Sequence, residues 1–155
     1  MPQTRRTLFT ATSVASALNG RACRQASPEF TSSKSAMGFR INVGNNETLW
    51  FYYYTPFVLV RLRNNAVDGF WRTGISGAQV FAVSGDRIVM QSGYHQNDWR
   101  LLQLRENACV DDMGRVEFID ENGDPLPARS ARARGNLIWF VHNSTIYRAD
   151  INGLR

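Results

Sequence analysis

A short segment of this chain recurs at a nearly constant spacing, and this recurrence constrains the fold more than any other feature. Residues 59–66 read LVRLRNNA and residues 101–108 read LLQLRENA, with five identities in eight positions at an offset of 42 residues. A fainter third copy, IYRADIN, occupies residues 146–152, a further 45 residues along the chain. A period of about 40–45 residues is typical of one supersecondary unit that is used several times.

Each copy of the repeat lies in a predicted β-hairpin. The paired segments are rich in β-branched and aromatic residues and are separated by Pro, Gly, Asn or Ser, which are turn-forming residues. The three predicted hairpins join residues 48–54 to 57–63, 87–91 to 99–105, and 136–141 to 145–150. Two more hairpins are expected, from 79–83 into 87–91 and from 116–119 through Asn122-Gly123. No segment of the body shows an amphipathic helical period with a cap, so the sequence predicts an all-β domain.

Two repeat architectures fit this period, and one architecture without repeats remains open. Three units of 42–45 residues would form a β-trefoil over residues 38–155. Alternatively, each unit is a propeller blade, and the chain must associate with other copies to close the ring, because propellers typically have 4–8 blades. If the recurrence has no structural meaning, a two-sheet β-sandwich is the alternative.

Two short resemblances accompany these architectures. Residues 96–101 (QNDWRL) with 108–111 (ACVD) resemble a ricin-type trefoil lectin repeat, although the Gln–Trp gap is one residue longer and Val110 replaces a Leu. Residues 137–140 (LIWF) with 146–153 (IYRADING) resemble a blade of the low-density-lipoprotein-receptor type of propeller. The first resemblance implies carbohydrate binding, and the second implies a propeller.

The first 37 residues differ in composition from the rest, and we expect them to form a leader that packs little against a single domain at 38–155. Thr4-Arg5-Arg6-Thr7-Leu8-Phe9 resembles a twin-arginine export motif, and Ala15-Ser16-Ala17 offers a cleavage signal. This favours a secreted or periplasmic protein. A mitochondrial transit peptide, or a disordered basic arm on a subunit of an assembled particle, is the alternative.

The positive net charge belongs mainly to the leader. The whole chain carries a formal charge of +5, whereas residues 38–155 contain 13 arginines against 12 acids. Nucleic-acid binding by the body is therefore not expected, since such affinity scales with the number of phosphates neutralised. No apolar run approaches the ~18 residues of a membrane-spanning helix.

The sequence contains few residues that suit catalysis or metal binding. His95 and His142 are the only histidines, and neither lies in a recognisable nucleophile motif. The acidic turn at 120–124 lacks the spacing of a calcium loop. Cys23 and Cys109 are the only cysteines, and no intradomain disulfide is expected because Cys23 lies in the leader and Cys109 in the body. We interpret Cys109 as a small buried apolar residue rather than a nucleophile. We therefore predict a protein that is not an enzyme, without a metal or other cofactor.

Two groups of residues are candidate binding sites. Tyr94, Asn97, Asp98 and Trp99 place an aromatic ring beside amide and carboxylate groups, which suits a sugar, although Trp99 could instead belong to the core. Arg129, Arg132 and Arg134 lie in a predicted loop without an acid and could bind an anionic partner.

These observations predict a secreted, non-catalytic β-rich module that binds carbohydrate or a partner protein and can form a homo-oligomer. A small coat-like or assembly subunit with a basic N-terminal arm is the second interpretation. A hydrolase is the third.

Overall fold

The computed structural model describes residues 4–12, 39–43, 48–53, 58–75, 80–91 and 98–154. Within these residues the protein is built from β-strands and one short 3-10 turn, η2 (Glu106–Ala108), which confirms the all-β prediction. The strands are β1 (Thr4–Thr12), β2 (Phe39–Val43), β3 (Thr48–Tyr53), β4 (Val58–Arg63), β5 (Ala66–Arg72), β6 (Phe81–Ser84), β7 (Arg87–Gln91), β8 (Trp99–Leu104), β9 (Val110–Ile119), β10 (Pro125–Leu126), β11 (Arg132–Arg134), β12 (Leu137–His142) and β13 (Thr145–Leu154).

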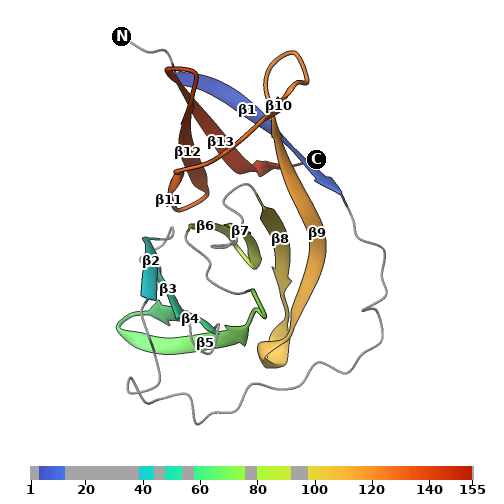
Figure 1. Cartoon of the computed structure of the whole chain (residues 1–155). Coiled ribbons are helices and arrows are strands. Elements are labelled where there is room, and N and C mark those ends of the chain that lie inside the picture. The colour runs from blue at the N-terminus through green and yellow to red at the C-terminus, as the bar shows by residue number, and fades with distance from the viewer. Residues whose placement is uncertain are drawn as a thin grey trace.

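The strands form two sheets (Figure 1). A large sheet has the order β11-β12-β13-β1-β9-β8-β7-β6, with β10 paired to β9, and a four-stranded sheet has the order β2-β3-β4-β5. Neighbouring strands are antiparallel except for β1 and β13, which are parallel. The predicted hairpins β3–β4, β6–β7, β7–β8, β9–β10 and β12–β13 are all present.

Strands β6, β7 and β8 form the central layer, because both of their faces are buried. Side chains alternate between the two faces of a strand, so neighbouring residues contribute to different cores. In β7, Val89 joins one apolar cluster while Ile88 and Met90 join the other. The first cluster is completed by β9, β12 and β13, and the second by Trp50, Leu59 and Trp71 of the four-stranded sheet.

The large sheet curls so that its two ends approach each other. The Val83 N–H of β6 donates to the Gly135 carbonyl, in the turn between β11 and β12, at 2.9 Å. Asn42 of β2 fixes this junction from a site that is only 2% exposed. Its Nδ2 donates to the carbonyls of Phe81 (2.5 Å) and Gly135 (3.3 Å), and its Oδ1 accepts from Gly135 N–H at 2.7 Å. One buried amide therefore joins the two sheets to the turn.

The recurring segments are strands, but a trefoil or propeller arrangement is not confirmed. Residues 59–63 lie in β4 of the four-stranded sheet, whereas 101–104 and 146–150 lie in β8 and β13 of the large sheet. Strands β4 and β8 have two antiparallel neighbours each, whereas β13 has one antiparallel and one parallel neighbour. The structure instead packs two sheets against each other, which is closer to the alternative expectation.

The N-terminal segment contributes a strand to the large sheet. Residues 4–7 of β1 pair with 146–149 of β13, and residues 8–12 pair with 115–119 of β9. The expectation that residues 1–37 pack little against the body is therefore wrong for residues 4–12. The proposed cleavage signal at Ala15-Ser16-Ala17 lies outside the described residues.

Candidate functional site

The outer face of β11, β12 and β13 brings arginines and apolar side chains together. The strand registers place Arg132 opposite Trp139, and Trp139 opposite Arg148. A second row joins Arg134 to Leu137 and Asp150, and a third joins Val141 to Ile146. We call this surface the basic-aromatic face, and its residues are Arg132, Arg134, Leu137, Trp139, Val141, Ile146, Arg148 and Asp150.

Burial along the strands shows that this face points away from the core. In β12, Ile138 and Phe140 are buried, whereas Leu137 and Trp139 are half-buried and Val141 is 60% exposed. In β13, Tyr147 and Ala149 are buried, and the intervening Arg148 is exposed. The alternation therefore leaves the Trp139 ring accessible between two arginines, with the aliphatic side chains of Leu137 and Val141 on the same face.

Local turn chemistry produces this arrangement. Asn143 and Ser144, between β12 and β13, have φ values of 48° and 60°, as a two-residue hairpin turn of type I′ requires. Gly135, between β11 and β12, has a φ of 58°, in the left-handed region that Gly adopts without strain. The two turns fix the register that places Trp139 between Arg132 and Arg148.

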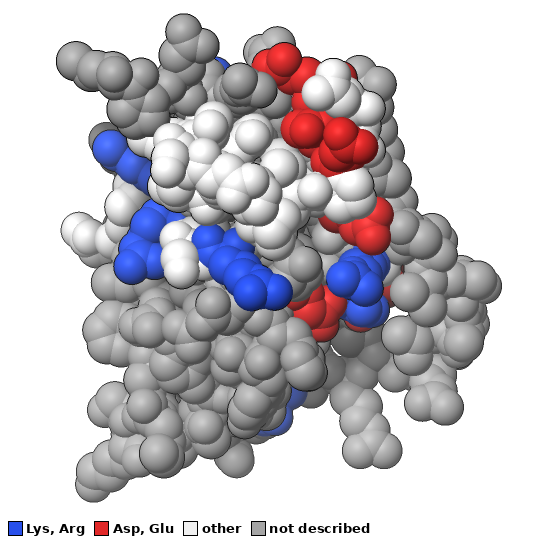
Figure 2. Space-filling view, turned by 45° about the horizontal axis from the view of Figure 1, so that its top comes forward, with Lys and Arg blue, Asp and Glu red and all other residues white. Residues whose placement is uncertain are grey.

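The arginines of this face have no acidic partner within the described part of the chain. The ion pairs there involve Arg61, Arg63, Arg100 and Arg105, and none includes Arg129, Arg132, Arg134 or Arg148. Arg132 Nη1 donates only to the adjacent Ala131 carbonyl, at 2.9 Å. The nearby Asp150 carboxylate is instead bonded to Asn136 Nδ2 and Asn152 N–H, at 2.6 and 2.9 Å. Figure 2 shows basic side chains across the middle of the surface it displays, with acidic side chains at the upper right and beside the basic group on the right.

Of the three arginines predicted to lie in a loop, only one does. Arg132 and Arg134 belong to strand β11, and Arg129 lies in the connection that precedes it. Ala128 and Ala131 of this connection are fully buried, so Arg129 is exposed from a segment that is anchored on both sides. Sequence reasoning missed Trp139 and Arg148, although alternation along the predicted hairpin at 136–150 places both on one face.

Trp99 belongs to the core and does not offer a face to a ligand. The side chain is fully buried, its ring contacts Phe118 edge-on at a centroid distance of 5.0 Å, and its Nε1 donates to the Ala128 carbonyl at 3.1 Å. The sugar-stacking role suggested for Trp99 is therefore corrected to the core alternative. Asp98 is half-buried, and Tyr94 and Asn97 lie outside the described residues. Trp99 instead supports the connection that carries Arg129.

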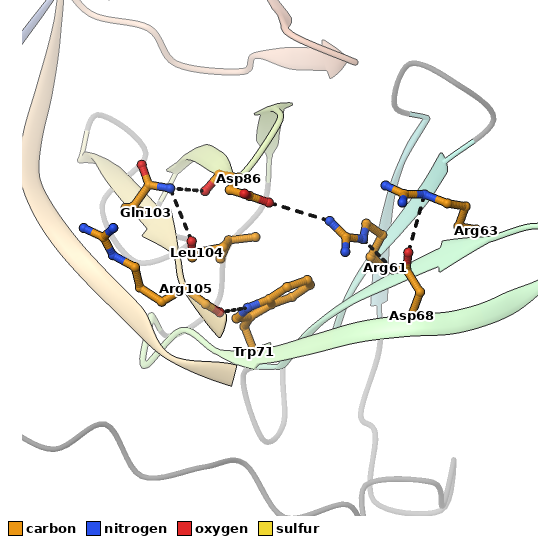
Figure 3. Close-up of polar contacts among 8 residues, drawn as sticks. All are labelled: Arg61, Arg63, Asp68, Trp71, Asp86, Gln103, Leu104 and Arg105. Carbon is orange, nitrogen blue, oxygen red and sulfur yellow. Dashed lines mark hydrogen bonds and ion pairs between the residues drawn. The ribbon is translucent and has the colours of Figure 1, made fainter. Parts of the chain in front are cut away.

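A second cluster of charged residues joins the two sheets and is neutralised internally (Figure 3). Arg61 Nε donates to Asp68 at 2.5 Å, and its Nη1 lies 3.7 Å from an Asp86 carboxylate oxygen in the β6–β7 turn. The guanidinium also lies over the rings of Trp50 and Trp71, at 5.4 and 5.2 Å from their centroids. Trp71 Nε1 donates to the Arg105 carbonyl at 2.9 Å. Because its charges and rings are already partnered, we interpret this cluster as a structural link between the sheets.

Cys109 follows η2 and is disulfide-bonded. The interpretation of Cys109 as a reduced, buried apolar residue is therefore wrong. The only other cysteine in the sequence, Cys23, lies outside the described residues. Sequence reasoning excluded a disulfide because it treated residues 1–37 as separate from the body.

Among the described residues, no three His, Cys, Asp or Glu side chains are grouped so that they could hold a metal ion. In the same part of the chain, no helix has the length and apolarity needed to cross a membrane.

The described residues form an all-β protein in which Arg132 and Arg148 lie on either side of Trp139. Residues 36–149 match the model of the YxzG family, and the chain therefore belongs to this family. No curated protein and no solved structure matches the chain significantly.

Proposed function

We propose that this protein is a non-catalytic, β-rich binding module and that the basic-aromatic face is its binding surface. The observation that supports this proposal is the row Arg132–Trp139–Arg148, in which two arginines without acidic partners flank an accessible ring. Tryptophan and arginine are the residues most enriched among those that dominate binding energy at protein interfaces. Rings and guanidinium groups on adjacent strands also present a flat surface that needs little rearrangement on binding.

The partner that fits this face best is an acidic protein segment with apolar side chains. Carboxylates would pair with Arg132, Arg134 and Arg148, while Leu137 and Val141 would cover apolar groups. Carbohydrate is less well supported, because the ring expected to stack on a sugar, Trp99, is buried. Nucleic acid is less well supported because the residues from 38 onward have a net charge near neutral.

Export remains part of the proposal on the sequence of residues 4–17 alone. Cleavage after Ala17 would remove β1 from the mature chain, because β1 ends at Thr12. The intact mass of the protein from its native host would show whether the binding module keeps this strand.

A peptide-binding assay tests the proposed surface. Fluorescent 12-residue peptides that alternate Asp or Glu with Leu or Phe would be compared with Lys-substituted versions, a glycan array and single-stranded DNA, with anisotropy used for the soluble probes. We expect acidic peptides to bind and the Lys versions not to bind. Arg132→Glu with Arg148→Glu should weaken binding roughly 10-fold or more, since each reversal replaces an attraction of about 0.2–1 kcal/mol with a repulsion.

Two further variants make the assay specific. Trp139→Ala should weaken binding by about 30-fold, corresponding to the ~2 kcal/mol typical of a dominant interface residue. Arg72→Glu is the matched control, because Arg72 is exposed on β5 of the four-stranded sheet and lies outside the proposed surface. Equal loss of binding in the control and the double reversal would show a nonspecific charge effect. Tighter binding to DNA or a glycan than to any acidic peptide would refute the proposed partner.

A further inference from the structure

The basic-aromatic face contains three columns of side chains that differ in chemistry, one for each of its strands. Strands β11, β12 and β13 are consecutive neighbours in the large sheet (Figure 1). The β12 column is apolar along its whole length, the β11 column is basic, and the β13 column changes from apolar through basic to acidic. The residues are Leu137, Trp139 and Val141 on β12, Arg132 and Arg134 on β11, and Ile146, Arg148 and Asp150 on β13. A partner that engages the whole face must therefore present three different columns at once.

The spacing of these columns selects the conformation of the bound segment. Neighbouring strands lie about 4.8 Å apart, so β11 and β13 are separated by roughly 9.6 Å. An extended segment directs every second side chain toward a sheet in a single column, and it therefore covers one strand. A helix is about 10–12 Å across and can carry an apolar stripe with polar residues on both flanks. The stripe of such a helix would cover β12 while its flanks reach the arginines of β11 and β13.

Asp150 breaks the symmetry of the charges on this face. Opposite Leu137, β11 carries Arg134 whereas β13 carries Asp150, so the two flanks have opposite charges in this row. In the next row, both flanks carry arginines. Asp150 Oδ1 accepts hydrogen bonds from Asn136 Nδ2 at 2.6 Å and from Asn152 N–H at 2.9 Å, and these bonds hold the carboxylate in place. An acidic group of a partner is therefore attracted at the arginine positions and repelled at the position of Asp150.

We propose that the basic-aromatic face, in its proposed binding role, takes an acidic amphipathic helix of a partner protein aligned with β12, and that Asp150 determines the charge pattern of this helix. The apolar column from Leu137 to Val141 is about 13 Å long, which corresponds to about nine helical residues. Acidic residues on the flanks of the helix meet the three arginines, and a basic or neutral residue meets Asp150. A helix with uniformly acidic flanks is disfavoured, because specificity often depends on an unfavourable contact with the wrong partner.

Two peptides of about 12 residues, long enough for the apolar column, test the conformation. One is a helix stapled on its far side, with Leu at i, i+3 and i+7 between flanking Glu residues, and the other alternates Leu and Glu in the same amounts. Fluorescence anisotropy with the full-length protein should show roughly 10-fold tighter binding of the helix, because the alternating peptide reaches the arginines of the flanks poorly.

The outcomes of this comparison separate the helix from the proposed function itself. If the alternating peptide binds as tightly as the helix, and Arg132→Glu with Arg148→Glu weakens both, the helix is overturned while the proposed function stands. If neither peptide binds, both are overturned. Tighter binding of the helix that is lost in the double reversal supports both.

A lysine scan of the helical peptide tests the role of Asp150. Each flanking Glu is replaced by Lys in turn, and Lys beside an arginine should weaken binding by roughly 2- to 30-fold, because an attraction becomes a repulsion. Lys beside Asp150 should instead strengthen binding. In Asp150→Asn, which keeps an acceptor for Asn136 and Asn152, no Lys replacement should strengthen it.

Glu121→Gln is the matched control for this scan, because Glu121 is exposed in the β9–β10 turn and lies outside the face. The control should keep the position at which Lys strengthens binding. If no Lys replacement strengthens binding to the wild type, the role of Asp150 is overturned without any variant of the protein. Strengthening that persists in Asp150→Asn would overturn it as well, because another group would then be responsible.

Discussion

Asn42 offers the sharpest test of how the two sheets are held together. Within the described part of the chain, Asn42→Ala removes the acceptor of the buried Gly135 N–H and both donations from Nδ2 to carbonyl groups. An unsatisfied buried group costs about 1–3 kcal/mol, and each lost hydrogen bond costs about 1 kcal/mol where the remaining group keeps another partner. The Gly135 carbonyl does keep such a partner, the Val83 N–H. We therefore expect a loss of about 2–4 kcal/mol in the free energy of unfolding.

Urea unfolding followed by tryptophan fluorescence measures this loss, and calorimetry provides a second readout. For a chain of this size, 1 kcal/mol lowers the melting temperature by about 2–4 °C, so the expected decrease is roughly 5–15 °C. Asn122→Ala is the matched control, because this amide is exposed in the β9–β10 turn and should change stability by less than about 0.5 kcal/mol. If Asn42→Ala is as stable as the control, the amide does not hold the sheets together.

Asn42→Asp separates the role of the amide donors from that of side-chain volume. The carboxylate keeps an acceptor for Gly135 N–H but directs its second oxygen at two carbonyl oxygens in a buried site. Burial and these carbonyls should raise the pKa of the introduced carboxyl group in the folded state above its unfolded value. The deficit relative to wild type should therefore be largest at neutral pH and shrink as the pH falls through the folded-state pKa. A deficit independent of pH would contradict the proposed geometry.

Other substitutions test the packing of rings and the N-terminal strand. Trp99→Ala should lower the free energy of unfolding by about 3–5 kcal/mol in thermal or urea unfolding, because it leaves a cavity in the core. Asp98→Ala should change it by less than about 0.5 kcal/mol, and a large loss there would show an unrecognised structural role. Gly69→Ala should lower the free energy of unfolding by about 1–3 kcal/mol in urea unfolding, since an added Cβ would overlap the Trp71 ring. Deleting residues 1–12 should lower the melting temperature and promote aggregation measured by light scattering, whereas an unchanged melting temperature would show that β1 does not stabilise the sheet.

The hairpins were predictable because their determinants are local. Asn122-Gly123, Ser84-Gly85-Asp86 and Asn143-Ser144 each place turn-forming residues between two strand-like segments, and all three connect antiparallel strands in the structure. Turn geometry depends on a few neighbouring residues, so a single sequence is sufficient to identify it. The way in which hairpins pack depends on contacts between residues far apart in sequence, which the local pattern does not contain.

The recurring segment shows why similarity in sequence did not imply equivalent positions. In both stronger copies a strand leads into a turn that contains residues with positive φ, Asn64 and Asn65 in one copy and Ala108 in the other. The shared residues therefore encode a strand and the turn that follows it. The leading leucines nevertheless enter different cores, since Leu59 packs in one cluster and Leu101 in the other. Local structure was repeated, whereas the tertiary position was not.

Only part of the basic-aromatic face could be predicted from the sequence, because the arginines and the strand alternation are local features and the position of the core is not. The lack of acids near Arg132 and Arg134 indicated cations without partners, and the structure contains no ion pair to either among the described residues. Alternation along 137–141 and 145–150 also groups Trp139 with Arg148 once the hairpin is assumed. The sequence alone does not show which face of β12 is exposed to solvent, because both faces carry apolar side chains. Only the position of the core shows that Ile138 and Phe140 point inward.

The packing of residues 4–12 against the body was not predicted because an export signal and a β-strand can share the same short pattern. An arginine pair followed by Leu8 and Phe9 resembles the start of an export signal, but Thr7, Thr10 and Thr12 are β-branched residues that favour a strand. The decisive information lies far along the chain, in β9 and β13, whose facing edges require a strand between them. Residues 4–12 pair with both of these edges, so the stability of the large sheet depends on a segment that lies outside the family-matched residues 36–149.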